Sequence, residues 1–406
     1  MSQSTMLSRR KALQFLTGAP LLPLGSAVSA AGLLTACGGG DDGPAKNYVA
    51  ASFTSMAAPT LANPQAMARM TVASQLKVQY SDNSEQSFDL GYQPFFVTGD
   101  EVPDGKGGKI LAGGYYDINN NKIIDRTVAG SERHFFSDAP DGTSLLTVPN
   151  AKVDGVKGKP VFAVVQFEYT TWAQDGKTDM YGKLPSPIAV LTLDQDQTTG
   201  KLSLVKYHNV DTSKVHGLWI TCGASLSPWN THLSSEEYEP DGAKPDSAQM
   251  KTFGANLYGS ADHAANPYDY GHLPEVTVHP DGTGSIKKHY CLGRISHELI
   301  QVMPDQRTAL MGDDATNGGL FMFVADKAAD LSAGTLYVAR YTQTSSQGVG
   351  GGTMRWIRLG HATSDEIRAL ASTLTIGDIM DVATKNPNDA SYTAIHHNGQ
   401  PNWIRL

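Results

Sequence analysis

The stretch PIAVLTLDQDQTTGKLSLVKYH, residues 187–208, decides the class of fold. An apolar run over 188–193 leads into a polar segment that ends at Gly200, and a second run rich in apolar residues follows over 202–207. Two runs of strand length that flank a polar, glycine-containing turn are typical of a β-hairpin. The stretch therefore predicts two antiparallel strands.

Similar patterns recur on both sides of this hairpin. Turn residues return about every ten to fifteen positions, which is typical of β-sandwiches and β-propellers. The pattern therefore predicts an all-β protein and leaves the choice between these two architectures open. Further strands are expected within residues 159–169, 274–293, 318–341 and 352–360.

One helix is predicted among the strands, over residues 363–374. Thr363 and Glu366 have the spacing of a capping box, which marks a helix N-terminus. We expect this helix to be an insertion that packs on a sheet edge. Its apolar residues share one face at helical spacing: Ile367, Leu370, Ala371 and Leu374.

The N-terminal residues have the features of a targeting segment. Arg9-Arg10 precede an apolar stretch that prolines interrupt, which resembles a twin-arginine export signal. The stretch ends in Leu-Thr-Ala-Cys at 34–37, which resembles a bacterial lipobox, and a glycine-rich segment follows. Cys37 is then expected to be the lipidated first residue of the mature chain. An ordinary cleaved signal with a chance cysteine is the alternative.

This interpretation divides the chain into three parts. We expect a signal peptide over 1–36, a flexible tether over 37–50 and one domain over 51–406. The protein would be an exported bacterial lipoprotein of the periplasm, the outer membrane or the cell surface, in contact with a membrane only through its lipid anchor. We expect a monomer.

Composition sets further bounds. The 406 residues are 40% hydrophobic and carry a net charge of −8, which is typical of a globular protein. The acidic balance argues against nucleic acid as a partner. Beyond Cys37, only Cys222 and Cys291 remain, and an oxidising compartment permits a disulfide between them.

Several acidic residues lie near the first of these cysteines or in similar strand-end positions. Adjacent carboxylates repel each other unless they are separated, solvated or neutralised by a cation. Carboxylate oxygens suit calcium or ferric iron, whereas a thiolate suits iron or zinc better. A thiolate among several carboxylates therefore suggests a site for more than one kind of metal. The candidate ligands are Cys222, Glu236, Glu237, Glu298, Asp313 and Asp314.

Plainer interpretations exist for parts of this set. His297-Glu298 lacks the second histidine of a zinc protease motif, because Gln301 stands in its place. Asp313 and Asp314 follow a strand beside a glycine, where acids are commonly turn residues. The segment 116–125 carries oxygen donors at alternate positions, as calcium loops do, but an asparagine-rich turn is the favoured interpretation.

Five ordered motifs resemble the PhoX-type alkaline phosphatases. The resemblance extends from about Asp194 to Arg340 and is weaker upstream. The motifs are CGASLSPWNTHLSSEEY at 222–238, NPYDYGHLPEVTV at 266–278, LGRISHE at 292–298, MGDDATNGGLFMFVA at 311–325 and LSAGTLYVAR at 331–340.

The resemblance implies a six-bladed β-propeller with helical insertions and a metal site that hydrolyses phosphomonoesters. That site combines Fe³⁺ ions bridged by a cysteine with Ca²⁺ ions. Cys222 would be the bridging thiolate, and Glu236 and Glu237 would be metal ligands. Glu298 would bind iron or calcium, and Asp313 or Asp314 would bind calcium.

Three consequences of the resemblance can be tested against a structure. Adjacent strand residues point to opposite faces, so Glu236 and Glu237 can share one site only if the strand bulges or twists. Arg294 is expected to hold the phosphate, with a structural ion pair as the alternative. No match to the family's late Arg-Pro-Glu segment occurs before Leu406, so a C-terminally truncated and incomplete propeller is expected.

Two other functions remain open at this stage. The first is a non-catalytic surface lipoprotein whose propeller keeps calcium for stability alone. The second is a calcium-dependent, lactonase-like hydrolase. Cys222 separates them from the phosphatase, because neither needs a thiolate.

Overall fold

The computed structural model describes residues 47–67, 71–316, 318–397 and 399–406. Arg9-Arg10 and Cys37 lie outside the described residues. The chain divides into two compact units, one with the residues up to Phe95 together with Gln197–Gly200, and one with Phe96–Asp196 and Lys201–Leu406.

The first unit contains one antiparallel sheet of three strands. Its strands are β1 (Tyr48–Phe53), β2 (Thr71–Tyr80) and β3 (Glu85–Gly91), and the short helix α3 (Pro64–Met67) lies between β1 and β2 in the sequence. The last residues of the expected tether, 37–50, therefore lie within β1.

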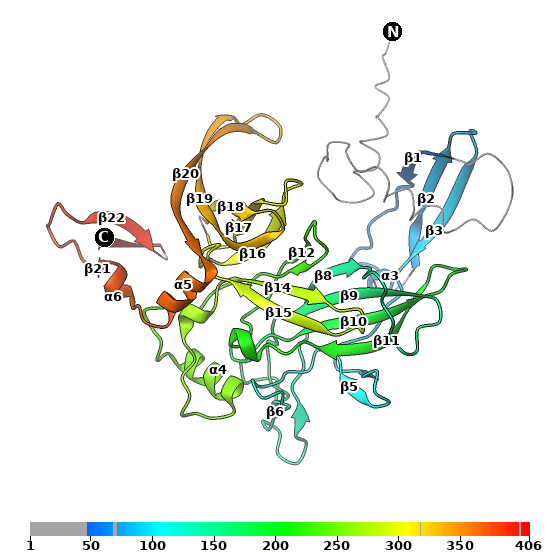
Figure 1. Ribbon diagram of the computed structural model, residues 1–406, viewed down its shortest axis with the longest axis horizontal. Coiled ribbons are helices and arrows are strands. Elements are labelled where there is room, and N and C mark those ends of the chain that lie inside the picture. Colours follow the sequence, from blue (N-terminus) through cyan, green and yellow to red (C-terminus); the bar gives the residue numbers. More distant parts are fainter. Residues whose placement is uncertain (1–46, 68–70, 317, 398) are drawn as a thin grey trace, which may run out of the picture. The chain divides into compact units, whose positions relative to one another are not determined.

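The second unit is built from larger antiparallel sheets in which each strand pairs with its neighbour in the sequence (Figure 1). The first sheet contains β8 (Pro140–Leu146), β9 (Lys159–Phe167), β10 (Ile188–Gln195) and β11 (Leu202–Asn209). The second contains β12 (Ser225–Leu226), β13 (His232–Leu233), β14 (Leu273–Val278) and β15 (Gly284–His289). The third contains β16 (His297–Val302), β17 (Thr308–Asp313), β18 (Leu320–Lys327), β19 (Asp330–Ser345) and β20 (Gly351–Thr363).

Meanders of four or five strands that stack face to face are the blades of a β-propeller. Apolar side chains of the first two sheets, such as Val164, Val190 and Val276, form one buried cluster between them. Leu233, Ile300 and Phe323 belong to another cluster, between the second and third sheets. These features confirm the expected all-β, propeller-like architecture with helical insertions.

The first strands of the three blades converge. Strand β12 contacts β8 of the preceding sheet and β16 of the following one. In a propeller the first strand of each blade lies nearest the axis. Residues at the ends of β8, β12 and β16 are therefore brought together from distant parts of the sequence.

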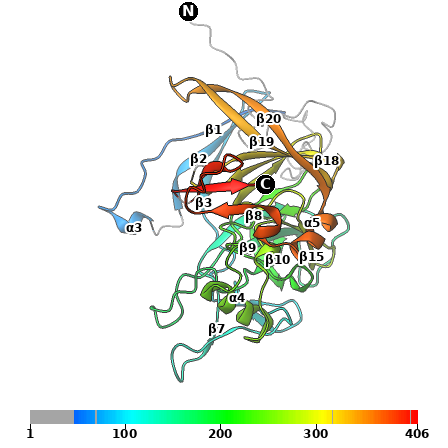
Figure 2. The same ribbon diagram turned by 90° about the vertical axis from the view of Figure 1, so that its left-hand side faces the viewer.

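Smaller elements complete the second unit. Helix α5 (Ser364–Ala371) has the predicted capping box of Thr363 and Glu366 and contacts β19 and β20, as expected. Figure 2 shows the β19–β20 hairpin extending beyond the other strands of its sheet. The remaining strands are β4 (Glu101–Pro103), β5 (Lys109–Leu111), β6 (Ile124–Asp125), β7 (Arg133–His134), β21 (Asp381–Ala383), β22 (Thr393–His397) and β23 (Gln400–Arg405). The other helices are η2 (Ser213–Val215), α4 (Ala248–Tyr258), η3 (Pro267–Asp269) and α6 (Ile376–Ile379).

Cys222 and Cys291 are both free, so the disulfide that the sequence permitted does not form in the structure. None of the described helices has the length and apolarity needed to cross a membrane.

Candidate metal centre

Five potential metal ligands gather where the first strands of the blades converge. Asp141, Glu168 and Cys222 form one group, and Cys222, Glu237 and Glu298 form a second; in each group the potential ligand atoms lie within 4.8 Å of one another. Cys222 Sγ lies 3.4 Å from Glu298 Oε2 and 3.6 Å from Asp141 Oδ2. The thiol is therefore the shared member of both groups.

The five ligands are supplied by separate parts of the chain. Asp141 belongs to β8, Glu168 directly follows β9, and Glu298 belongs to β16. Cys222 and Glu237 flank an isolated antiparallel bridge between Thr221 and Glu236. The cluster thus exists only once three sheets have packed together.

Close backbone packing holds the Cys222 segment in place. The Cys222 carbonyl accepts a hydrogen bond from Gly142 N at 3.1 Å, and Ser235 Oγ donates to the Gly223 carbonyl at 2.6 Å. A Cβ atom at Gly223 would lie 2.2 Å from the Glu298 carbonyl oxygen. Glycine at 223 is therefore needed for the thiol and Glu298 to approach each other.

A buried histidine also supports this segment, through Gln166. Gln166 Nε2 donates to the carbonyls of Cys222 and Gly223. His232 Nε2 contacts Gln166 Oε1 at 3.0 Å, and its Nδ1 contacts Ser144 Oγ at 2.9 Å. Burial lowers the pKa of His232 to about 3, so its imidazole is neutral and fixes the orientation of Gln166.

Backbone strain occurs on both sides of the cluster. Ile220 has φ 33° and Tyr238 has φ 46°. Both values lie in the left-handed region of backbone conformation, which residues other than glycine, asparagine and aspartate rarely adopt. Such outliers are commonly found at functional sites, where the surrounding contacts impose them. Trp219 Nε1 donates to the Tyr238 carbonyl at 3.0 Å, and Ser296 Oγ accepts from Tyr238 N at 2.7 Å.

The cluster has excess negative charge. Among the described residues, no lysine, arginine or histidine forms an ion pair with Asp141, Glu168, Glu237 or Glu298. Burial raises the pKa of Glu168 to about 7, and the charges of Asp141 and Glu298 add to the shift. Burial and the charges of Glu298 and Glu168 likewise raise the pKa of Glu237 to about 7.

The donor set fits metal cations. Burial, with Glu237, Asp141 and Glu168, raises the pKa of the Cys222 thiol, so its thiolate needs a positive charge nearby. Four carboxylates suit calcium or iron, and the thiolate suits iron. Cations at this position would satisfy all five side chains at once.

The structure does not bring Glu236 to this cluster. Its carboxylate is fully buried and pairs with Lys288 Nζ at 2.9 Å. Oε1 also accepts from Trp219 N, and Oε2 accepts from Gly271 N and His272 N, each at 3.0 Å. Both glutamates lie outside the named strands, at the isolated bridge of Thr221 and Glu236, and Glu236 points to the interior whereas Glu237 points to the cluster.

Arg294 also has hydrogen-bond partners outside the cluster. Its Nε donates to the Tyr270 carbonyl at 3.0 Å, and one Nη donates to the carbonyls of Pro267 and Pro240. The guanidinium also lies over the Tyr268 ring. The structure therefore gives Arg294 a role in holding these loops and does not direct it at the cluster.

The two neighbouring aspartates separate. Asp313 ends β17 and accepts from the backbone N–H groups of Ala315 and Gly319, as a turn residue does. Asp314 accepts from the Tyr238 hydroxyl at 2.5 Å, and its charge contributes to the raised pKa of Glu237. Asp314 therefore lies beside the cluster, and Asp313 stabilises the turn.

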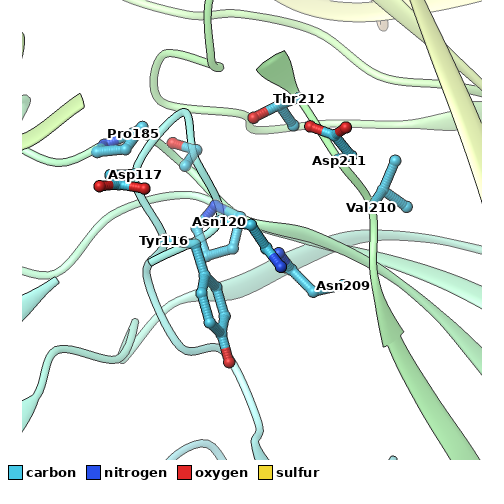
Figure 3. Close-up of a pocket in the computed structure, with 10 residues that line it drawn as sticks. Tyr116, Asp117, Asn120, Pro185, Asn209, Val210, Asp211 and Thr212 are labelled. Carbon is cyan, nitrogen blue, oxygen red and sulfur yellow. The ribbon is translucent and has the colours of Figure 1, made fainter. Parts of the chain in front are cut away.

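The segment 116–125 forms the expected turn. Asp117 Oδ1 accepts from Asn119 N and Asn121 N at 2.9 and 2.7 Å. Figure 3 shows a small pocket where Asp117 and Asn120 lie near Asn209 and Asp211, and it has room for about one water molecule. The pocket shares no residue with the Cys222 cluster.

Sequence reasoning missed Asp141 and Glu168. Asp141 precedes Gly142 in a stretch that has the composition of a turn, so it gave no metal signal. Glu168 could be seen in the sequence, because it is the acidic residue that directly follows Phe167 near the end of an expected strand. Their distance in sequence from Cys222 hid their proximity.

Comparisons with known proteins identify the family. A search of curated proteins gives no match for this chain. The solved structure of Pseudomonas fluorescens PhoX in complex with vanadate, a transition-state analogue, matches with a TM-score of 0.44 and 16% identity, over 77% of this chain and 72% of that chain. The family model of the alkaline phosphatase PhoX matches residues 193–403, more than half of the chain. The chain therefore belongs to the PhoX alkaline phosphatase family.

Proposed function

We propose that this protein hydrolyses phosphate monoesters at the cluster of Asp141, Glu168, Cys222, Glu237 and Glu298, with Fe³⁺ and Ca²⁺ as its metals. The observation that carries the proposal is a thiol among four carboxylates with which no cationic side chain of the described residues forms an ion pair. A calcium site kept for stability alone has no use for the thiol. Membership of the PhoX family supports the phosphatase activity.

Each part of the cluster has a distinct task. When bound, the metal ions neutralise the phosphate oxygens and supply Lewis-acid chemistry for attack on phosphorus. Cys222, which belongs to both groups of carboxylates, would be an iron ligand. Glu168 and Glu237 give up their protons to bind metal, so the site loads best above their pKa of about 7. Asp314, held by the Tyr238 hydroxyl, would be an additional calcium ligand.

The structure supports a revision of two expected roles. Glu236 would stabilise the fold through Lys288 instead of binding metal. Arg294 would position the loops around 240 and 267–270 instead of contacting phosphate.

Cys222→Ser tests the proposal, with Cys291→Ser as the matched control for a buried cysteine outside the cluster. Elemental analysis should find iron and calcium in the wild-type protein and in Cys291→Ser, and little iron in Cys222→Ser. Hydrolysis of p-nitrophenyl phosphate should fall at least about 100-fold in Cys222→Ser only. Calcium alone, unchanged by Cys222→Ser, would favour the lactonase-like or ligand-binding alternatives.

The cellular location is a separate proposal. Arg9-Arg10 and the Leu-Thr-Ala-Cys sequence at 34–37 support export and lipid attachment at Cys37. We also propose that the protein is a monomer. Expression with radiolabelled palmitate should label the wild-type protein in the membrane fraction and not Cys37→Ala. Equal labelling of both proteins would contradict a lipid anchor at this residue.

A further inference from the structure

Two backbone carbonyl groups next to the Cys222 thiol have all their hydrogen bonds made within the protein. The Cys222 carbonyl accepts from Gly142 N and from Gln166 Nε2. The Gly223 carbonyl accepts from Ser235 Oγ at 2.6 Å and from Gln166 Nε2 at 3.2 Å. A carbonyl oxygen has two lone pairs, so each of the two accepts as many hydrogen bonds as it can. The Gln166 amide therefore holds the backbone on the C-terminal side of the thiol.

Gln166 can hold both carbonyls in only one orientation of its amide group. A flipped amide would place Oε1 against two carbonyl oxygens, and none of these atoms can donate a hydrogen bond. On the other side of the buried amide, Oε1 lies 3.0 Å from His232 Nε2. His232 Nε2 must therefore carry a proton, since an amide oxygen only accepts.

Ser144 selects this form of the imidazole. His232 is fully buried and neutral, so one of its ring nitrogens donates and the other accepts. Because Nε2 is the donor, Nδ1 is the acceptor, and Ser144 Oγ lies 2.9 Å from it. The Ser144 hydroxyl on β8 thus donates to His232 on β13, which donates to Gln166 on β9. The three side chains form a relay in which every donor points toward the Cys222 segment.

We propose that the relay of Ser144, His232 and Gln166 positions the Cys222 thiol and thereby determines how tightly the centre binds iron relative to calcium. This inference rests on the proposed function, in which Cys222 is an iron ligand. The thiol is the soft donor of the cluster, and the four carboxylates also suit calcium. A shift of the Cys222 backbone should therefore weaken iron binding more than calcium binding.

His232→Phe and His232→Gln test the inference. Phenylalanine keeps a planar ring without nitrogens, whereas the amide of glutamine carries an N–H donor in place of Nε2. His272→Phe is the matched control, since His272 is also buried and its Nε2 contacts the Tyr268 carbonyl at 2.9 Å, outside the relay. Elemental analysis gives the iron and calcium contents of the loaded proteins. Titration with desferrioxamine, a chelator selective for Fe³⁺, gives iron retention, followed by the visible absorption band of the iron-bound thiolate.

The chelator concentration that removes half of the iron should be at least about tenfold lower for His232→Phe than for the wild type, at unchanged calcium content. Partners that orient a metal ligand from outside the coordination sphere have effects of this size. The absorption band should also shift, because its energy depends on how the thiolate meets the iron. His232→Gln and His272→Phe should keep the position of the band and stay within about threefold of the wild type in iron retention. A purely structural role of His232 would lower stability without a shift of the band.

Ser144→Ala is a milder variant, because it removes one hydroxyl from the relay, and it should lower iron retention in the same direction. Unchanged iron retention and an unchanged band in Ser144→Ala and His232→Phe, or in whichever of them folds, would overturn the inference and leave the phosphatase intact. Equal losses of iron and calcium in His232→Phe would also overturn it, since the relay would then support the whole cluster. A wild-type protein without iron would overturn the proposed function and the inference with it.

Discussion

Two adjacent glutamates show how one short segment can contribute to stability and to the metal centre. Glu236 is buried, and four donors, including Lys288, fill its two oxygens. Glu237 points the other way and lies beside Cys222 and Glu298, and no cationic side chain in the described part of the chain forms an ion pair with it. A buried ion pair is weak evidence for net stabilisation, but removal of one partner leaves the other charge uncompensated.

Lys288→Met should therefore lower the free energy of unfolding by about 3–5 kcal/mol, because Glu236 would stay buried without its counter-charge. Urea unfolding of the metal-loaded protein measures this. Lys287→Met is the control, since that lysine is half exposed in its pair with Glu275 and should cost at most about 1 kcal/mol. The double variant Glu236→Gln/Lys288→Met should be more stable than Lys288→Met alone. Loss of metal from Glu236→Gln at unchanged stability would instead make Glu236 a ligand.

At the scale of the elements, the site depends on how closely the first strands of the blades approach. The Cys222 segment lies against β8 through Gly142 and against β16 through Gly223. At both glycines a side chain would meet backbone atoms, which cannot move without shifting a strand. The glycines therefore set the distance between Cys222 and the carboxylates.

Gly223→Ala should separate Cys222 from Glu298 and reduce iron content. It should also cost roughly 1–3 kcal/mol of stability, because the new Cβ would overlap the Glu298 carbonyl. Gly312→Ala in β17 is the matched control, since its Cβ would meet nothing within 4 Å, and it should change stability by less than about 0.5 kcal/mol. Iron content and urea unfolding of both variants check the prediction. A Gly223→Ala protein with full iron content would contradict it.

The same elements show how much the sequence could predict. The hairpin of β10 and β11 was predictable because its apolar runs and polar turn are local features, and Cys222, Glu237 and Glu298 were predictable because they lie in short motifs. The role of Glu236 was not, because its partner Lys288 lies 52 residues away on another strand. Asp141 and Glu168 come from the preceding blade, so only the packing of the sheets reveals them.

For the molecule as a whole, the cluster links the packing of three sheets to the binding of metal. In the absence of metal, the carboxylates that meet there repel one another, and this repulsion opposes the packing. Cations that bind the folded state and not the unfolded chain reverse the effect. Metal loading and stability should consequently depend on each other, and pH should reveal the coupling.

In the metal-free protein, Glu168 and Glu237 have a folded pKa of about 7, above the ordinary value of 4.5. Below pH 4.5 both groups are protonated in the folded and the unfolded states, and their contribution to stability is fully present. As the pH rises towards 7, the unfolded chain releases these protons first, so the free energy of unfolding falls. The loss should be complete once the pH exceeds the folded pKa.

Urea unfolding of the metal-free protein between pH 4.5 and 8 should therefore show wild type losing stability relative to Glu168→Gln, which carries no titrating group at 168. Glu132→Gln, at an exposed position outside the cluster, should follow the wild type throughout. With metal bound, the carboxylates stay ionised, and the difference between wild type and Glu168→Gln should change sign in favour of the wild type near pH 8. Parallel pH profiles for the metal-free wild type and Glu168→Gln would show that Glu168 is not part of a mutually repelling cluster.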